Sequence, residues 1–160
     1  MRTFIAAPLP DEVRKNIVEL INGLKEVGSG VKWVEEKNLH ITLKFLGWVE
    51  EKKVDNLISL VAGAVAATGG IKAKFAGRVR SDGNVFEDMG TYTPGKRTRL
   101  IWAGKTEGGD KLKKLADSLE ENLSKAGYRS EEREFSSHIT IGRVKNDKGA
   151  DKLLEKIGEF

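Results

Sequence analysis

The chain contains two histidines, and both begin the same short pattern. Residues 40–43 read HITL and residues 138–141 read HITI. The ordinary pKa of an imidazole is about 6.5, so the side chain can accept or donate a proton near neutral pH. Two imidazoles beside a phosphodiester could divide the proton transfers, one taking a proton from water and the other protonating the leaving oxygen. His40 and His138 are therefore the candidate acid–base pair.

Each histidine is followed two residues later by a threonine. Alternate residues of a strand face the same way, so a strand would place His40 and Thr42 on one face, and likewise His138 and Thr140. The aliphatic residues between them would point into the core. If the two strands lie side by side, the imidazoles and hydroxyls share one groove. The threonine hydroxyls could then bind the non-bridging oxygens of a phosphate.

The histidines have two other interpretations, a structural role and a zinc site. An isolated His-x-Thr is commonly a structural histidine, but the matched pair in strand-like surroundings favours a functional role. A zinc site is disfavoured because the chain has no cysteine and catalytic zinc usually needs three protein ligands. A carboxylate could supply the third ligand, yet no HExxH-type spacing is present. We therefore expect a site without a metal or another cofactor.

Alternating strand and helix patterns must position these residues. Apolar runs or alternation predict strands at residues 3–7, 31–34, 39–49, 71–80, 98–103 and 135–144. Apolar residues at helical spacing predict three helices between them. Their stripes are Val13, Ile17, Leu20, Ile21 and Leu24; Val54, Leu57, Ile58, Val61 and Val65; and Leu112, Leu115, Leu119 and Leu123. This order predicts an α+β domain with helices packed on sheet.

Several segments carry weaker signals. Residues 81–96 are rich in Gly, Asp, Asn and Thr, which predicts a hairpin or a loop. The chain closes on a short amphipathic segment with Leu153, Leu154 and Ile157. Phe45 has the strand parity of Ile41, so we expect it in the core. Three other aromatic residues stay open as candidates for stacking on a base: Trp33, Trp48 and Tyr92.

The composition fits a compact, modestly basic protein. The chain has 160 residues, a formal net charge of +4, and 32% charged residues. A mild positive excess favours anionic partners such as phosphates or RNA without establishing one. The apolar start is interrupted by Pro8 and Pro10, unlike a signal peptide, and no stretch has the length of a membrane span. We expect a cytoplasmic protein that does not bind membranes.

The two histidine motifs and their flanks resemble a known family. Trp33 with residues 38–47 (NLHITLKFLG), and residues 135–143 (FSSHITIGR), resemble the two signatures of the 2H phosphoesterases of the RNA 2′,3′-cyclic phosphodiesterase and 2′-5′ RNA ligase (LigT-like) branch. Residues 1–6 (MRTFIA) and 100–104 (LIWAG) are similar to other strands of that family. The resemblance implies a two-lobed α+β fold, with antiparallel sheets around a central cleft and helices outside.

The resemblance also implies roles for individual residues. The expected reaction is metal-independent hydrolysis of an RNA 2′,3′-cyclic phosphate end to a 2′-phosphate. His40 would be the proton donor to the leaving 3′ oxygen, and His138 the acceptor that activates water. Arg143 matches the phosphate-binding arginine of the second signature. Because its parity on an ideal strand is opposite to that of His138, a bend or bulge after Thr140, or action from the strand end, is required.

The sequence departs from the family pattern in three places. Ser137 stands where the family usually has proline. The segment 78–99 is longer and more polar than usual; its basic residues are candidate RNA contacts, although a solvated charged loop is the simpler interpretation. They are Arg78, Arg80, Lys96, Arg97 and Arg99. The family also generally continues with another strand pair beyond Phe160, so we expect residues 1–160 to form a single domain without that pair. An exposed sheet edge, dimerisation or a shortened chain are the open consequences.

Two alternative functions stay open. One is 2′-5′ ligation of RNA halves, which uses the same histidines in the reverse direction. The other is a non-catalytic nucleotide- or RNA-binding module, against which the intact histidines and threonines argue. In each case the expected partner is RNA or a nucleotide with a 2′,3′-cyclic phosphate. We favour a monomer.

Overall fold

The computed structural model describes residues 1–27, 30–71, 74–79, 99–107, 109–132, 134–145 and 152–153. The chain forms two compact units. Unit 1 contains Met1–Ala7, Ile41–Lys74 and Lys105–Ser137, and unit 2 contains Pro8–His40, Phe75–Gly104 and His138–Phe160. Each unit therefore combines three separate stretches of sequence.

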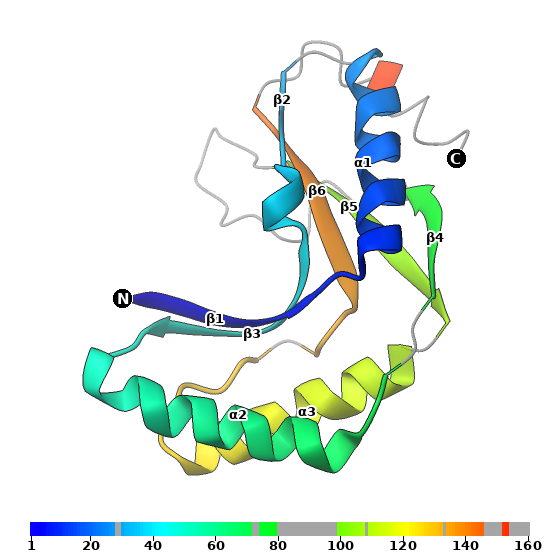
Figure 1. The fold of residues 1–160 in the computed structure, drawn as a ribbon. Helices are drawn as coiled ribbons and strands as arrows, with labels where there is room; N and C mark the ends of the chain where they lie inside the picture. The colour runs from blue at the N-terminus through cyan, green and yellow to red at the C-terminus, as the bar shows by residue number, and fades with distance from the viewer. Residues whose placement is uncertain are drawn as a thin grey trace. The chain divides into compact units, whose positions relative to one another are not determined.

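Unit 1 contains strands near the N-terminus and two packed helices. Strand β1 (Arg2–Pro8) and strand β3 (His40–Trp48) are neighbours in the sheet. Both strands belong to unit 1, apart from one end residue each, Pro8 and His40, which belong to unit 2. At their ends the Met1 amino group donates to the Val49 carbonyl at 2.8 Å, and the Val49 N–H donates back to Met1 at 2.9 Å. Helix α2 (Val54–Thr68), preceded by the 3₁₀ turn η2 (Glu51–Lys53), packs against helix α3 (Gly109–Lys125) (Figure 1).

The apolar stripes of these two helices differ in how well they were predicted. All four leucines expected on α3 are buried, so that stripe is confirmed. On α2 the expected stripe is partly wrong, since only Leu57 and Ala64 are buried, while Ile58 is 60% exposed and Val65 is 48% exposed. The helix is apolar on several sides, so its period alone does not identify the face that packs.

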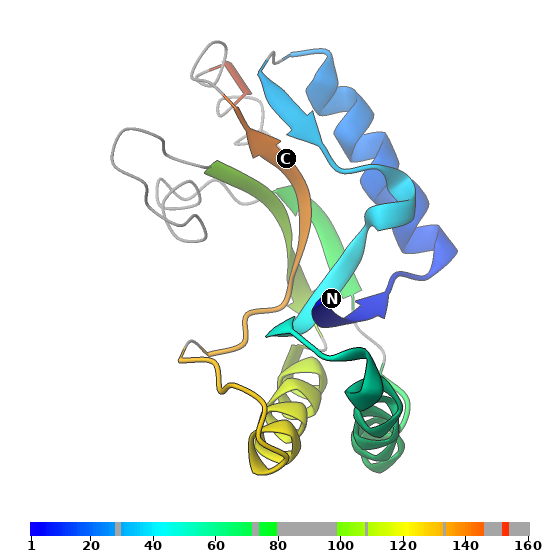
Figure 2. The same cartoon turned by 90° about the vertical axis from the view of Figure 1, so that its left-hand side faces the viewer.

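Unit 2 is built on antiparallel pairing with strand β6 (His138–Val144). Strand β2 (Val31–Trp33) pairs with β6, and strand β5 (Arg99–Glu107) also pairs with it up to Gly104, beyond which β5 runs into unit 1. Strand β4 (Lys74–Val79) neighbours β5. Helix α1 (Asp11–Lys25) lies along one face of these strands (Figure 2).

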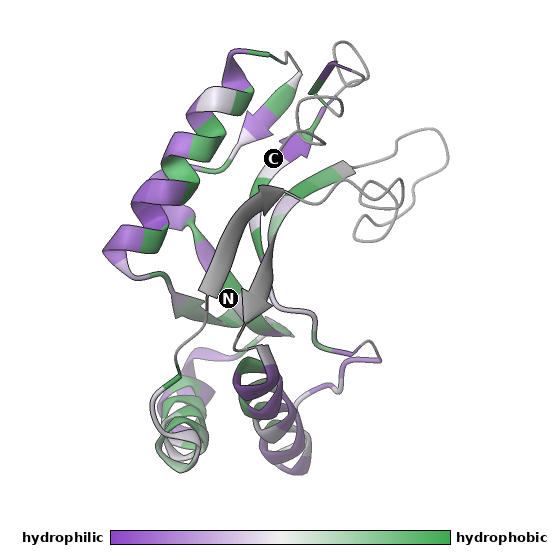
Figure 3. Cartoon of the chain, turned by 90° about the vertical axis from the view of Figure 1, so that its right-hand side faces the viewer, coloured by the Kyte–Doolittle hydropathy of each residue, from purple (hydrophilic) through white to green (hydrophobic). Residues whose placement is uncertain are grey.

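The packing of α1 follows from its sequence. The helix begins directly after Pro10, with Asp11 and Glu12 in its first turn, where carboxylates interact favourably with the helix dipole. Its buried residues are Ile17, Leu20, Ile21 and Leu24. Figure 3 shows apolar residues on the side of α1 toward the strands and hydrophilic residues on its outer side. The predicted stripe is therefore confirmed, apart from the half-buried Val13.

The α+β fold class is confirmed: helices and antiparallel strands alternate along the chain. The predicted hairpin or loop at 81–96 lies outside the described residues. Most of the predicted terminal amphipathic segment also lies outside them, and only Lys152 and Leu153 are seen, in helical conformation. The single domain over 1–160 stays a prediction. Within the described ranges, every helix is too short or too polar to cross a lipid bilayer.

Candidate active site

The two histidine motifs share one pattern of burial. In β3 and in β6 the seven residues that begin with the histidine are half-buried, buried, half-buried, buried, buried, exposed and buried. His40, Thr42, His138 and Thr140 are thus accessible, and the aliphatic residues between them are buried. Strand parity therefore gave the correct order for the first four residues of each copy. It fails from the fifth residue onward in both.

In β6, a change in the strand register explains why the alternation fails. Consecutive residues of β5 pair with residues of β6 that are two apart, because Trp102 is opposite Thr140 and Ile101 is opposite Gly142. Ile141 is therefore an extra residue on β6, which makes a β-bulge at this point. A bulge of this kind shifts the alternation by one residue beyond it. The bulge expected after Thr140 is thus present.

The bulge brings Arg143 to the face that carries His138. On β5, residues 100, 102 and 104 share one face because they alternate. They lie directly opposite Arg143, Thr140 and His138, respectively. Directly opposite residues of an antiparallel pair project from the same side of the sheet. His138, Thr140 and Arg143 consequently share one face of unit 2, which we call the histidine face.

The other face of this strand is occupied at Gly142. A Cβ atom there would lie 2.9 Å from Val31 Cγ1 and 3.0 Å from Trp33 Cε3. Val31 and Trp33 therefore cover Gly142 on the side away from the histidine face. This removes Trp33 from the aromatic residues that could line the site with His138.

The orientation of His40 is set by the main chain before it. Its Nδ1 lies 2.7 Å from the carbonyl oxygen of Asn38, at the end of the 3₁₀ turn η1 (Glu36–Asn38). A carbonyl oxygen can only accept, so Nδ1 carries the hydrogen of this bond. If His40 exchanges a proton with a substrate, as predicted, Nε2 is the ring nitrogen that can do so. Strand patterns could not reveal this contact, because it depends on the turn and not on a side chain.

Trp102 lies beside the predicted site residues, and the sequence did not single it out. It is half-buried, lies opposite Thr140, and presents its ring to the His138 imidazole with centroids 6.0 Å apart and planes at 63°. Its alternation with Ile101 and Ala103 was readable from the sequence. The sequence did not show which strand would lie beside Trp102, because the pairing of β5 with β6 joins residues far apart in the chain.

In β3 the prediction that Phe45 belongs to the core is wrong. Phe45 is 59% exposed and its ring contacts Phe4, with centroids 6.2 Å apart. Lys44 is buried instead, with 1% of its surface exposed. The Phe45 N–H donates to the Glu131 carboxylate at 3.0 Å. The strand thus reverses its inward side at Lys44, as β6 does at Gly142.

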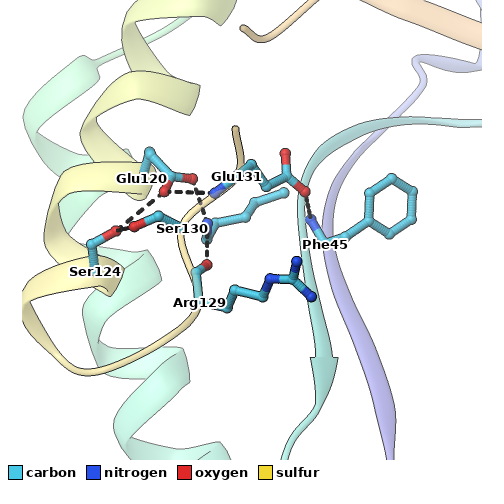
Figure 4. A network of polar contacts seen from close by, with 7 residues as sticks. Phe45, Glu120, Ser124, Arg129, Ser130 and Glu131 are labelled. Atoms are coloured by element: carbon cyan, nitrogen blue, oxygen red, sulfur yellow. Dashed lines mark hydrogen bonds and ion pairs between the residues drawn. The ribbon is translucent and has the colours of Figure 1, made fainter. Parts of the chain in front are cut away.

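A polar network within unit 1 holds the buried Lys44 (Figure 4). Its ammonium forms an ion pair with Glu120 on α3 and donates to the Arg129 carbonyl at 3.0 Å. Glu120 also accepts from the Glu131 N–H and from Ser124 Oγ, each at 3.1 Å. Lys44 therefore joins β3 to α3 and to the segment that leads toward His138.

Opposing effects act on the pKa of Glu120. Partial burial raises it, but the hydrogen bonds from Lys44, the Glu131 N–H and Ser124, together with the charge of Lys44, outweigh burial and lower the pKa of Glu120 below its ordinary value. The carboxylate is thus held in its charged form.

The remaining predicted residues have different outcomes. Thr42 belongs to unit 1, whereas both histidines, Thr140 and Arg143 belong to unit 2. Trp48 is 80% exposed in unit 1. Ser137 is buried, and its hydroxyl has no hydrogen-bond partner among the described residues. Tyr92, Arg80, Lys96 and Arg97 lie outside the described residues, as do the side chains of Arg78 and Arg99.

Within the described ranges, no three His, Asp or Glu side chains gather as a set of metal ligands. Reaction without a metal stays a prediction, which a chelator can test.

The chain is similar to LigT-like phosphoesterases over most of its length. The model of the family described as LigT like Phosphoesterase matches residues 7–81 and 104–160. A protein of Thermotoga maritima named RNA 2′,3′-cyclic phosphodiesterase is 37% identical over 159 residues, covering 98% of this chain and 78% of that protein. A protein of Methanocaldococcus jannaschii with the same name is 32% identical and covers 100% and 81%, respectively.

Solved structures extend the similarity to three dimensions. The crystal structure of E. coli LigT complexed with 3′-AMP superposes with a TM-score of 0.61 at 29% identity, covering 92% of this chain and 73% of that chain.

Proposed function

Because this chain belongs to the LigT-like phosphoesterase family, we propose that it hydrolyses RNA 2′,3′-cyclic phosphate ends to 2′-phosphates with His40 and His138 as its acid–base pair. Relatives that cover nearly the whole chain carry the name of this activity. The proposed substrate is RNA or a nucleotide with such an end. An RNA substrate favours a cytoplasmic location, and we expect a monomer.

The proposed reaction is a single displacement at phosphorus. Water attacks the cyclic phosphate and gives a proton to the imidazole of His138. The bond between phosphorus and the 3′ oxygen breaks, and that oxygen takes a proton from Nε2 of His40. The products are a 2′-phosphate and a 3′-hydroxyl. Thr42, Thr140 and Arg143 would bind the phosphate oxygens, on which negative charge grows in the transition state.

The observation that carries the proposal is the shared face of His138, Thr140 and Arg143. Without the bulge at Ile141, the guanidinium would point away from the histidine face. With it, a cation lies on the same face as a base and a hydroxyl, which is a set of groups suited to a phosphate. The matching exposure pattern of β3 supports the same use of His40 and Thr42.

The test is turnover of an oligoribonucleotide that ends in a 2′,3′-cyclic phosphate. Removing either imidazole takes away one proton transfer, so His40→Ala and His138→Ala should each lower kcat by about 10²–10⁴-fold. Wild-type turnover should be unaffected by EDTA and should pass through a maximum as pH rises, since one histidine must be charged and the other neutral. The product should be identified by chromatography as the 2′-phosphate.

Lys15→Ala serves as the control, because this exposed lysine lies on α1, outside the histidine face. Near wild-type turnover in either histidine variant would contradict the assignment of the pair. Loss of wild-type turnover in EDTA, restored by a divalent metal, would contradict the metal-independent mechanism.

A further inference from the structure

Lys32 extends the histidine face by one strand. It is the central residue of β2 and lies directly opposite Arg143 of β6. Opposite residues of an antiparallel pair share a face. Its neighbours Val31 and Trp33 cover Gly142 on the side away from that face, which independently places Lys32 with Arg143. Lys32 is exposed to solvent.

Two cations directly opposite each other repel, which destabilises the strand pair. Within the described ranges, no carboxylate lies within ion-pair distance of Lys32 or of Arg143. Other exposed lysines do have such partners, as Lys37 with Glu35 at 3.0 Å and Lys113 with Asp117 at 3.1 Å. An anion bound between Lys32 and Arg143 would remove the repulsion.

The spacing along β6 indicates which anion this is. Thr140 and Arg143 lie opposite Trp102 and Leu100, which are two residues apart on β5. At the usual rise of a strand, this is a separation of about 7 Å along the histidine face. That separation is comparable with the distance between successive phosphates of an extended RNA strand. A reacting phosphate beside His138 and Thr140 would therefore place its neighbouring phosphate near Lys32, and the five N–H donors of Arg143, between the two, can bind oxygens of both phosphates.

We propose that Lys32, with Arg143, binds the 5′-phosphate of the nucleotide that carries the cyclic phosphate. The inference rests on the proposed function and adds to it a preference for RNA ends over simple nucleoside cyclic phosphates. Lys32 acts in binding and takes no part in proton transfer. Its ammonium can follow a phosphate as a point charge, whereas Arg143 offers the planar set of donors.

The test compares adenosine 2′,3′-cyclic phosphate with and without a 5′-phosphate. Wild type should show a higher kcat/KM on the 5′-phosphorylated substrate, by roughly fivefold, as expected for one partly solvated ion pair. Lys32→Ala should bring this ratio toward one, Lys32→Glu should invert it, and Lys32→Arg should preserve it. Lys15→Ala should keep the wild-type ratio, because it removes the same charge outside the histidine face.

A wild-type ratio near one, or a ratio unchanged in Lys32→Ala, would overturn the inference and would leave Lys32 as a solvated lysine. Binding measured by calorimetry separates this failure from a failure of the proposed function. Adenosine 3′,5′-bisphosphate should bind wild type more tightly than adenosine 3′-phosphate, with the difference lost in Lys32→Ala. If wild type hydrolyses neither cyclic substrate, the proposed function fails and this binding difference still decides the role of Lys32.

Discussion

Lys44 occupies a position in β3 where its residue type would not be expected, and two partners compensate for its burial. A buried ammonium is costly unless it is paired and hydrogen-bonded. Here Glu120 and the Arg129 carbonyl provide both. The same contacts hold residues 129–131, in the segment before His138, because Glu120 also accepts a hydrogen bond from the Glu131 N–H.

Replacing Lys44 should therefore destabilise the protein. Lys44→Met keeps much of the aliphatic volume but leaves the Arg129 carbonyl and Glu120 without their donor. Since Glu120 is about one-third exposed, water offsets part of the loss, and we expect the free energy of unfolding to fall by about 1–3 kcal/mol. Urea denaturation measures this change.

Lys113→Met is the matched control, because Lys113 is on α3 in the same unit and its ion pair is exposed. It should change the free energy of unfolding much less than Lys44→Met does, because water and salt screen an exposed ion pair. Equal effects of the two substitutions would contradict the role given to Lys44.

The lowered pKa of Glu120 predicts a dependence of stability on pH. A carboxyl whose pKa is lower in the folded state contributes stability above its unfolded pKa, near 4.3, and loses that contribution as pH falls toward the folded value. Glu120→Gln should thus be less stable than wild type at neutral pH, with the difference narrowing in acid. Urea denaturation from about pH 7 to about pH 3 would measure this; a difference that stays constant would exclude the linkage.

At the scale of elements, the main departure from ideal strands is the bulge of β6. It leaves two consecutive residues buried, Ile141 and Gly142. The second must be very small, because Val31 and Trp33 fill the space where a Cβ would project. The pairing of β2 with β6, and hence the place of Lys32, depends on this close approach.

Gly142→Ala should consequently be destabilising, by about 1–3 kcal/mol, because the added methyl forces Val31 and Trp33 to move. Gly23→Ala is the contrasting substitution in the same unit. Gly23 lies inside α1 with open space where the methyl would be, so alanine should stabilise by about 0.5–1 kcal/mol. Thermal unfolding of both variants would check the opposite signs; similar shifts would contradict the packing at Gly142.

Local patterns predicted most elements because their causes are local. Helices α1 and α3 each have one narrow apolar stripe, and strand alternation fixed the accessible faces of His40, Thr42, His138 and Thr140. Phe45 was misplaced because parity assumes a regular strand, while Lys44 is buried by partners from distant residues of the chain. Trp102 and Lys32 were missed because their positions follow from strand register, which no local pattern encodes.

At the scale of the whole molecule, chain order and spatial order diverge. Residues close in sequence, such as His40 and Ile41, belong to different units, while His40 and His138 belong to the same unit. His40 is the last residue of unit 2 before β3 enters unit 1, and His138, the first residue of β6, is where the chain returns to unit 2. Each unit thus assembles residues from three separate stretches of the chain, and the two histidines of unit 2 come from the first and the third of its stretches.

The bulge at Ile141 also has a consequence for how such sites can be found. On a regular strand, a residue on the face of His138 would be separated from it by an even number, but Arg143 follows it by five. The odd interval in the sequence therefore indicates the bulge in the strand. A sequence search could require an arginine five residues after the histidine of the second motif. It would then select sequences whose strand contains this bulge, in addition to the histidine motif itself.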